Sequence, residues 1–164
     1  MAENSKGRSG GESESERERI NRELIELLNE LRVALPGVQV LFAFLLAVPF
    51  SNGWTKATTF QRDMFFATLI CTTISAVLLI APSAYHRLHF RQGNKLHLLM
   101  TANRMSIAGL VFLAAAMVGA VTLVTDVLYN AGVTVGFGVA TALVFAAVWL
   151  GLPLYRRLEL GRRD

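Results

Sequence analysis

Two histidines three residues apart, His86 and His89, are the residues whose types and spacing could carry chemistry most directly. On a helix this spacing would place both imidazoles on one face, where they could bind a divalent cation or titrate near neutral pH. A stable metal site needs a third or fourth ligand, and no cysteine or carboxylate is close in sequence. The pattern therefore favours headgroup-facing interface histidines over a metal site, with a pH-sensitive interface at His86 and His89 as the alternative. We expect neither a metal nor a cofactor.

The central segment that contains both histidines, residues 86–104, is basic. It lies between two pairs of long apolar runs and contains four cations, Arg87, Arg91, Lys95 and Arg104. Cations beside membrane spans are suited to anionic lipid headgroups, so we predict headgroup contacts for these four residues. Because the bases border apolar runs and form no aromatic-interleaved basic face, we expect no nucleic-acid partner.

Polar side chains within the apolar runs are scarce. Gln39 is the one strongly polar residue well inside a predicted span, where it would be either a polar contact between helices or part of a pore lining. Asp63 and Asp126 lie at predicted span ends, and for Asp126 we expect a cap or turn at the start of the next helix. No nucleophile–base pair, phosphate-binding loop or paired carboxylates occur in the spans, so we expect no enzymatic activity.

The elements that must position these residues are helical. Of the 164 residues, 53% are hydrophobic and 17% are charged, and the apolar residues form long uninterrupted runs. About 20 apolar residues in a helix cross a hydrocarbon core of roughly 30 Å. We therefore predict an all-α polytopic membrane protein whose four transmembrane helices form two hairpins within residues 36–155. The predicted spans cover about residues 36–50, 65–85, 105–125 and 131–152.

The two ends of the chain are polar. Residues 1–18 have no branched apolar or aromatic side chain, which predicts a disordered polar tail. In residues 19–35 the apolar residues recur at spacings of three and four, which predicts an amphipathic cytoplasmic or interfacial helix. Its heptad pattern covers barely two repeats, too few to argue for a coiled coil. Residues 156–164 form a basic tail.

Small residues at helical spacing suggest how two of the spans pack. Gly132 and Gly136 form a GxxxG pattern in the last span, and Ala115 and Gly119 repeat the spacing in the third. Such residues let helix backbones approach closely in lipid, so we predict a tight hairpin between these spans. In the second span, hydroxyl side chains are expected to bond to carbonyls of their own helix or of a neighbour; these are Thr68, Thr72, Thr73 and Ser75.

Orientation follows from the basic residues. Fourteen of the 16 Lys and Arg lie in the N-terminal tail and helix, the central segment and the C-terminal tail, and the other two, Lys56 and Arg62, lie in the first loop. Because basic residues collect on the cytoplasmic side, both termini are predicted to be cytoplasmic.

Several stretches also carry a family resemblance. The run from Glu30 to Phe50, the run from Ala81 to Arg91, the Asn103–Gly109 segment and the Gln61–Arg62 pair resemble a family of small bacterial four-helix membrane proteins classed as a domain of unknown function. The resemblance covers roughly residues 30–149 and implies a bacterial plasma-membrane location. Some members of that family carry an automatic sodium/proton antiporter label. Exchange of this kind normally needs an ionisable group inside the membrane, and every Asp and Glu here lies outside the predicted spans.

Two functional hypotheses remain from the sequence. In the first, the protein is a small oligomeric channel or transporter in which copies of the first span bring Gln39 to a shared axis. In the second, it is a non-transporting interaction or scaffold protein, which docks a partner or anionic lipid through its cytoplasmic helix and a basic rim. This rim consists of the four cations of the central segment together with Arg32, Arg156 and Arg157. The lipid bilayer is a partner in both hypotheses, and a homo-oligomer is required by the first.

Overall fold

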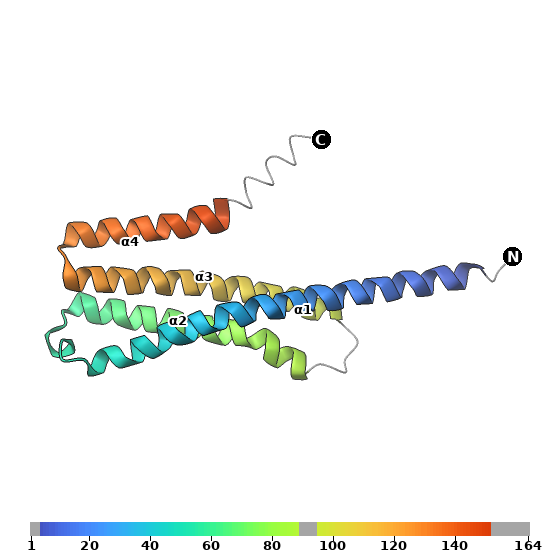
Figure 1. Cartoon of the computed structure of the whole chain (residues 1–164), viewed down its shortest axis with the longest axis horizontal. Helices are drawn as coiled ribbons and strands as arrows, with labels where there is room; N and C mark the ends of the chain where they lie inside the picture. Colours follow the sequence, from blue (N-terminus) through green and yellow to red (C-terminus); the bar gives the residue numbers. More distant parts are fainter. Residues whose placement is uncertain (1–3, 89–94, 152–164) are drawn as a thin grey trace. The chain divides into compact units, whose positions relative to one another are not determined.

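Wherever the structure describes it, the chain is helical or forms short turns between helices, and these residues contain no strand. The computed structural model describes the backbone of residues 4–88 and 95–151, and the side chains of residues 18–84 and 99–149. Four α-helices follow in order: α1 (Asn4–Ala47), α2 (Thr59–Leu88), α3 (Lys95–Leu128) and α4 (Ala131–Ala146) (Figure 1). Two 3-10 turns, η1 (Val48–Phe50) and η2 (Trp54–Lys56), connect α1 to α2, and a π-helical segment, η3 (Ala147–Gly151), follows α4.

All four helices contain a segment long and apolar enough to cross a membrane. These segments are Glu18–Phe50, Thr59–Ala84, Leu99–Leu128 and Ala131–Trp149. The prediction of an all-α protein with four candidate spans is therefore confirmed.

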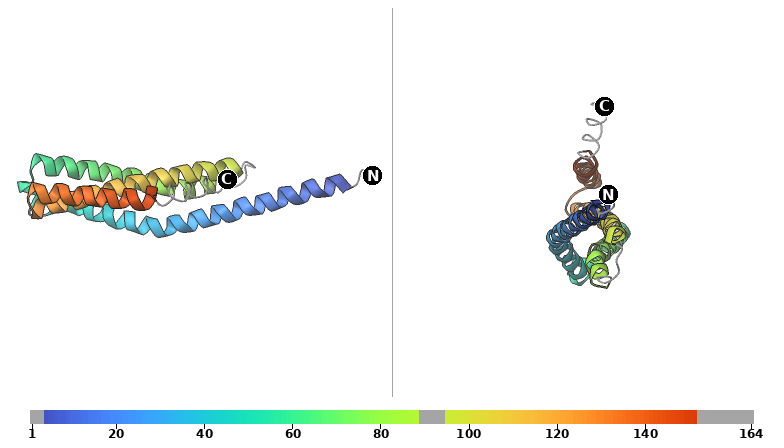
Figure 2. Two further views of the ribbon diagram at one scale, coloured as in Figure 1. Left: turned by 90° about the horizontal axis from the view of Figure 1, so that it is seen from above. Right: turned by 90° about the vertical axis from the view of Figure 1, so that its right-hand side faces the viewer.

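The first helix is longer than the sequence indicated. It runs without a break from Asn4 to Ala47, as a single ribbon in both views of Figure 2. Residues 4–18, predicted as a disordered tail, are helical; the segment lacks apolar residues, but its Glu, Lys and Arg are good helix formers. Pro36, predicted as the start of a separate helix, lies inside α1. Its ring replaces one N–H donor, and the turns on either side keep the helix continuous across it.

The next two helices also begin before their predicted starts. The structure begins α2 at Thr59 and α3 at Lys95, whereas the apolar runs predicted starts at residues 65 and 105. Hydropathy locates the part of a helix that fits hydrocarbon, but the backbone bonds of a helix continue into polar sequence until a cap or turn ends them. Pro82 is buried inside α2 and does not end the helix.

The buried residues of α1 follow a seven-residue repeat. Leu24, Leu31, Val38 and Leu45 are each at most 5% exposed, and they recur at every seventh position. Half-buried residues lie three positions after each of them: Leu27, Ala34, Leu41 and Val48. Alternating spacings of three and four are typical of the seam, the line of contact along a left-handed helical pair. This seam runs from the polar half of α1 past Pro36 into the apolar half.

The helices form two compact units. Unit 1 comprises Met1–Val40 and Ile74–Leu110, and unit 2 comprises Leu41–Thr73 and Val111–Asp164. In unit 1 the α2–α3 contact is close at Gly109: a Cβ there would lie 2.8 Å from the side chain of Leu79, and the Ser75 hydroxyl donates to the Gly109 carbonyl at 2.8 Å. A small residue and a cross-helix hydroxyl bond thus hold the two helices together.

In unit 2, α2 meets α3 at another glycine. A Cβ on Gly119 would collide with the hydroxyl of Thr68, which is 2% exposed. An apolar cluster of Leu45, Phe65 and Leu123 lies in the same unit. The predicted hydroxyl bonds are confirmed: Thr68, Thr72 and Thr73 each donate to the carbonyl four residues earlier, while Ser75 crosses to α3.

The last helix packs through a different face from the one predicted. A Cβ on Gly138 would lie 2.7 Å from the Thr122 hydroxyl of α3, and Thr134, one turn earlier, is also buried. Gly136 is exposed with nothing near its Cβ position, and Gly132 meets only the side chain of its own cap. The predicted α3–α4 hairpin exists, but its close contact uses the face one-half turn away from the GxxxG pair.

The prediction that Ala115 and Gly119 of α3 pack against the fourth span also differs from the structure. Gly119 does pack closely, but against Thr68 of α2, and Ala115 is exposed. A four-residue spacing defines a helix face and leaves open which neighbour that face meets.

Candidate functional site

A polar network at one end of unit 2 begins with the cap of α2. The backbone N–H of Gln61 donates to the Thr58 hydroxyl at 3.2 Å, and the backbone N–H of Thr58 donates to the Gln61 side-chain oxygen at 3.1 Å. This reciprocal pair is a capping box, which satisfies two donors that a helix start would otherwise leave unbonded. It explains why α2 begins at Thr59, and it fixes the orientation of the Gln61 amide.

The fixed amide reaches across to α3. Gln61 Nε2 donates to the Asp126 carboxylate at 2.9 Å, a hydrogen bond between residues 65 positions apart in the chain. Asp126 is half-buried in the last turns of α3. A hydrogen bond to a charged acceptor contributes about 1.5–3 kcal/mol, roughly twice a neutral one. Gln61 therefore both starts α2 and ties it to α3.

The prediction that Asp126 caps the following helix is wrong. The N-cap of α4 is Asn130, whose side-chain oxygen accepts from the backbone N–H of Val133 at 3.1 Å. Because α3 continues to Leu128, Asp126 is a helical residue, and only Tyr129 and Asn130 connect α3 to α4.

A cavity of about 460 Å³ lies beside this network, within unit 2. One wall is apolar and comes from the last turns of α3, with Leu123, Val124, Val127 and Leu128. The polar part of the lining comes from the connection between α1 and α2 and from the start of α2, with Ser51, Lys56 and Gln61. Among the described lining residues, Lys56 is the charged one.

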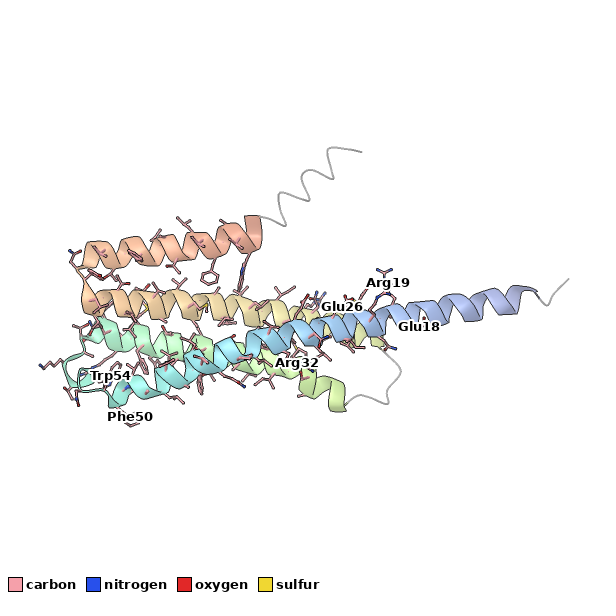
Figure 3. The ribbon with its side chains drawn as sticks, viewed as in Figure 1. Glu18, Arg19, Glu26, Arg32, Phe50 and Trp54 are labelled. Atoms are coloured by element: carbon pink, nitrogen blue, oxygen red, sulfur yellow. The ribbon has the colours of Figure 1, made fainter. Side chains whose placement is uncertain are left out.

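Trp54 forms part of the same cavity wall. Its ring meets Phe65 edge to face, with centroids 4.8 Å apart, and packs against the apolar cluster of unit 2. Figure 3 labels Trp54 and Phe50 in the turns that follow α1; Phe50 is 89% exposed. Trp54 thus links the cavity to the apolar cluster.

Gln39, the polar residue of the first candidate span, lies in unit 1 on the exposed side of α1. It directly follows Val38, which is fully buried in the seven-residue seam. Among the described residues, the Gln39 side chain has no hydrogen-bond partner. The polar contact predicted for Gln39 is therefore not made within the described part of this chain.

A second, acidic groove of about 430 Å³ lies in unit 1 between the polar half of α1 and the start of α3. Its lining residues are Glu23, Glu26, Leu27, Glu30, Leu99, Met100 and Asn103. At its edge Arg19 Nε lies 2.9 Å from the Glu23 carboxylate. Both side chains are well exposed, so this ion pair contributes little to stability. Figure 3 shows Arg19, Glu26 and Arg32 along the same helix.

The basic segment is described only in part. Arg104 lies exposed on α3. The backbones of His86 and Arg87 belong to α2 and that of Lys95 to α3, but their side chains lie outside the described set. His89 and Arg91 lie outside the described residues altogether. The predicted headgroup contacts and the pH-sensitive histidine interface therefore stay predictions.

The capping box was missed in the sequence although its signal was present. Thr58-Thr59-Phe60-Gln61 has the Thr-x-x-Gln form that marks a helix start ahead of an apolar run. The bond from Gln61 to Asp126 had no comparable signal, because local spacing cannot relate residues on different helices.

Four candidate spans with polar connections define the class of an all-helical, multi-pass membrane protein. Within that class, the chain belongs to a family of unknown function, DUF6328, whose model matches residues 13–153. The resemblance seen in the sequence, to an uncharacterised family of this kind, is thereby confirmed. Comparison with curated proteins and with solved structures gives no match for this chain.

Proposed function

We propose that this protein is a small oligomeric channel or transporter of the bacterial plasma membrane, with both termini in the cytoplasm. An even number of spans supports termini on one side, and the distribution of Lys and Arg, fourteen against two, supports the cytoplasmic side. The family match adds no activity, so the proposal depends on the side chains of the spans.

The observation that carries the proposal is the exposure of Gln39. Its neighbours on the exposed side of α1 are apolar, with Val40 56% and Phe44 70% exposed. A side-chain amide without a hydrogen bond costs about 4–8 kcal/mol on transfer from water to hydrocarbon. Association of several α1 helices would remove Gln39 from lipid, and the amides would then hydrogen-bond to one another or line a hydrated path.

The burial of the spans supports association through α1. In the most apolar windows, 28% of the residues are buried in α2 and α3 but only 11% in α1 and in the span that contains α4. The single chain thus leaves most of this face of α1 available to a second copy or to lipid.

Flux measurements on purified protein in liposomes test the proposal. Proton, sodium and potassium gradients are imposed on the wild type, Gln39→Leu, Gln39→Asn and Val40→Leu. We expect flux in the wild type, loss in Gln39→Leu, retention of most flux in Gln39→Asn, and no change in the control Val40→Leu. Cross-linking in the bilayer is measured in parallel, and a strictly monomeric protein would refute the shared path.

The acidic groove of unit 1 favours a second candidate function, a non-transporting protein that docks a partner through the polar half of α1. Glu23, Glu26 and Glu30 supply three carboxylates along one groove. In this second candidate function, the basic rim, which includes Arg87 and Arg91, would bind anionic lipid. Absence of flux under every gradient, together with partner capture that is lost when the three glutamates become glutamine, would favour this candidate over transport.

A further inference from the structure

We propose that the cavity of unit 2 binds a single-chain anionic amphiphile of the fatty-acid class, with its charged head at Lys56 and its chain along α3. This site is separate from Gln39 and does not depend on transport.

The shape of the cavity suits one acyl chain. Its volume of about 460 Å³ lies in the range of about 300–1,000 Å³ typical of small-molecule sites. The apolar wall from Leu123 to Leu128 rises about 8 Å along α3, the length of a segment of one chain.

The wall is accessible from the side of the helices. Val124, Val127 and Leu128 are 57%, 65% and 66% exposed although they line the cavity. A ligand dissolved in the membrane could therefore enter laterally, without passing through water. Trp54, which also lines the cavity, is of the residue type that favours the boundary between hydrocarbon and water.

The charge at the polar end selects an anion. Lys56 is exposed and lines the cavity, and its ammonium can donate to a carboxylate head. The Gln61 side chain, which also lines the cavity, is already hydrogen-bonded within the protein: its oxygen accepts from Thr58 and its Nε2 donates to Asp126. Lys56 is therefore the main donor for the head of the ligand. The Asp126 carboxylate is not among the lining groups, and it accepts from Gln61 Nε2.

The chain provides its own reporter for this site. It contains two tryptophans, Trp54 in the cavity wall and Trp149, which packs edge to face on Phe145. Trp149→Phe keeps an aromatic ring beside Phe145 and leaves Trp54 as the single source of indole fluorescence.

The experiment measures quenching of Trp54 by a brominated fatty acid in Trp149→Phe protein held in zwitterionic nanodiscs. We expect saturable quenching at low mole fraction, reversed by the unbrominated acid and far weaker with a brominated trimethylammonium amphiphile of equal chain length. Lys56→Gln should weaken the apparent affinity about tenfold, as expected for loss of one charge-assisted hydrogen bond. Lys56→Arg should retain it.

Two further variants distinguish binding in the cavity from attraction to surface charge and from misfolding. Arg62→Gln removes the other cation of the same region, which does not line the cavity, and should leave quenching unchanged. Ala57→Leu adds volume to the lining and should reduce quenching while far-UV circular dichroism stays helical. Quenching that rises linearly with mole fraction, is equal for both head charges, or falls as much in Arg62→Gln as in Lys56→Gln would overturn the proposal.

Discussion

Gly119→Ala should destabilise the protein, although alanine is normally the better helix residue. The added Cβ would lie 3.3 Å from the Cβ of Thr68 and would collide with its hydroxyl. Thr68 has little room to move, because it is 2% exposed and its hydroxyl donates to the Met64 carbonyl at 2.7 Å. Either α2 and α3 must separate, or Thr68 must leave its rotamer and lose this bond.

The competing effects can be compared in magnitude. Replacing glycine by alanine within a helix gains about 1 kcal/mol from backbone entropy. Overpacking a buried contact typically costs about 1–3 kcal/mol, and loss of the Thr68 hydrogen bond adds about 1 kcal/mol. We therefore expect Gly119→Ala to lower the free energy of unfolding by about 1–3 kcal/mol. Gly136→Ala, with nothing within 4 Å of its Cβ position, should be neutral or slightly stabilising.

Unfolding in mixed micelles, with SDS as denaturant and far-UV circular dichroism as the signal, measures both variants against the wild type. Combining Gly119→Ala with Thr68→Ala should recover part of the loss, because the smaller side chain makes room for the new methyl group. Such a double-mutant cycle isolates the contact between the two positions. The packing argument fails if Gly119→Ala is as stable as Gly136→Ala. It also fails if the effects of Gly119→Ala and Thr68→Ala on the free energy of unfolding are additive.

Three smaller changes test the hydrogen bonds that define the fold, by the same unfolding measurement. Gln61→Ala removes both the capping box of α2 and the donor to Asp126, and should cost about 1–3 kcal/mol; a change near zero would mean that water replaces both bonds. Ser75→Ala should cost about 0.5–1.5 kcal/mol because its hydroxyl bonds to a backbone carbonyl of α3, whereas Thr73→Ala, whose bond is exposed and within its own helix, should cost less. Asn130→Ala should cost about 0.5–2 kcal/mol through loss of the α4 cap, and Asn130→Asp should restore most of it.

The number and place of the spans could be predicted because the thickness of the hydrocarbon core fixes the number of apolar residues that a spanning helix needs. Each of the four candidate spans contains an apolar window long enough to cross the hydrocarbon core. The helix starts could not be read in the same way, because they depend on backbone donors. The Thr58–Gln61 capping box begins α2 six residues before its apolar run, and a search for this four-residue pattern would have located it.

The packing faces were harder to predict, since small residues occur on more than one face of a membrane helix. The fourth span has small residues at Gly132 and Gly136 and also at Thr134 and Gly138, and the second pair is the buried one. Spacing alone treats the two pairs as equivalent. The partner helix decides between them, and its position is a property of the whole fold.

The seven-residue repeat of α1 relates the two candidate functions to each other. In residues 19–35 alone the heptad pattern covers barely two repeats, whereas in the structure the repeat continues past Pro36 through Val38. Residues directly before a seam position, Glu23 and Glu30, lie on the flank that faces the acidic groove of unit 1.

Residues directly after a seam position lie on the opposite flank, since each residue turns the helix by about 100°. This flank includes Ile25, Arg32 and Gln39, all of them exposed. Because the repeat fixes both flanks of one continuous helix, assembly of copies through Gln39 would leave the glutamates free. Glutamine in place of the three glutamates should therefore not alter flux, and Gln39→Leu should not alter partner capture. The two functions can be tested independently in one protein, and each set of variants is the control for the other.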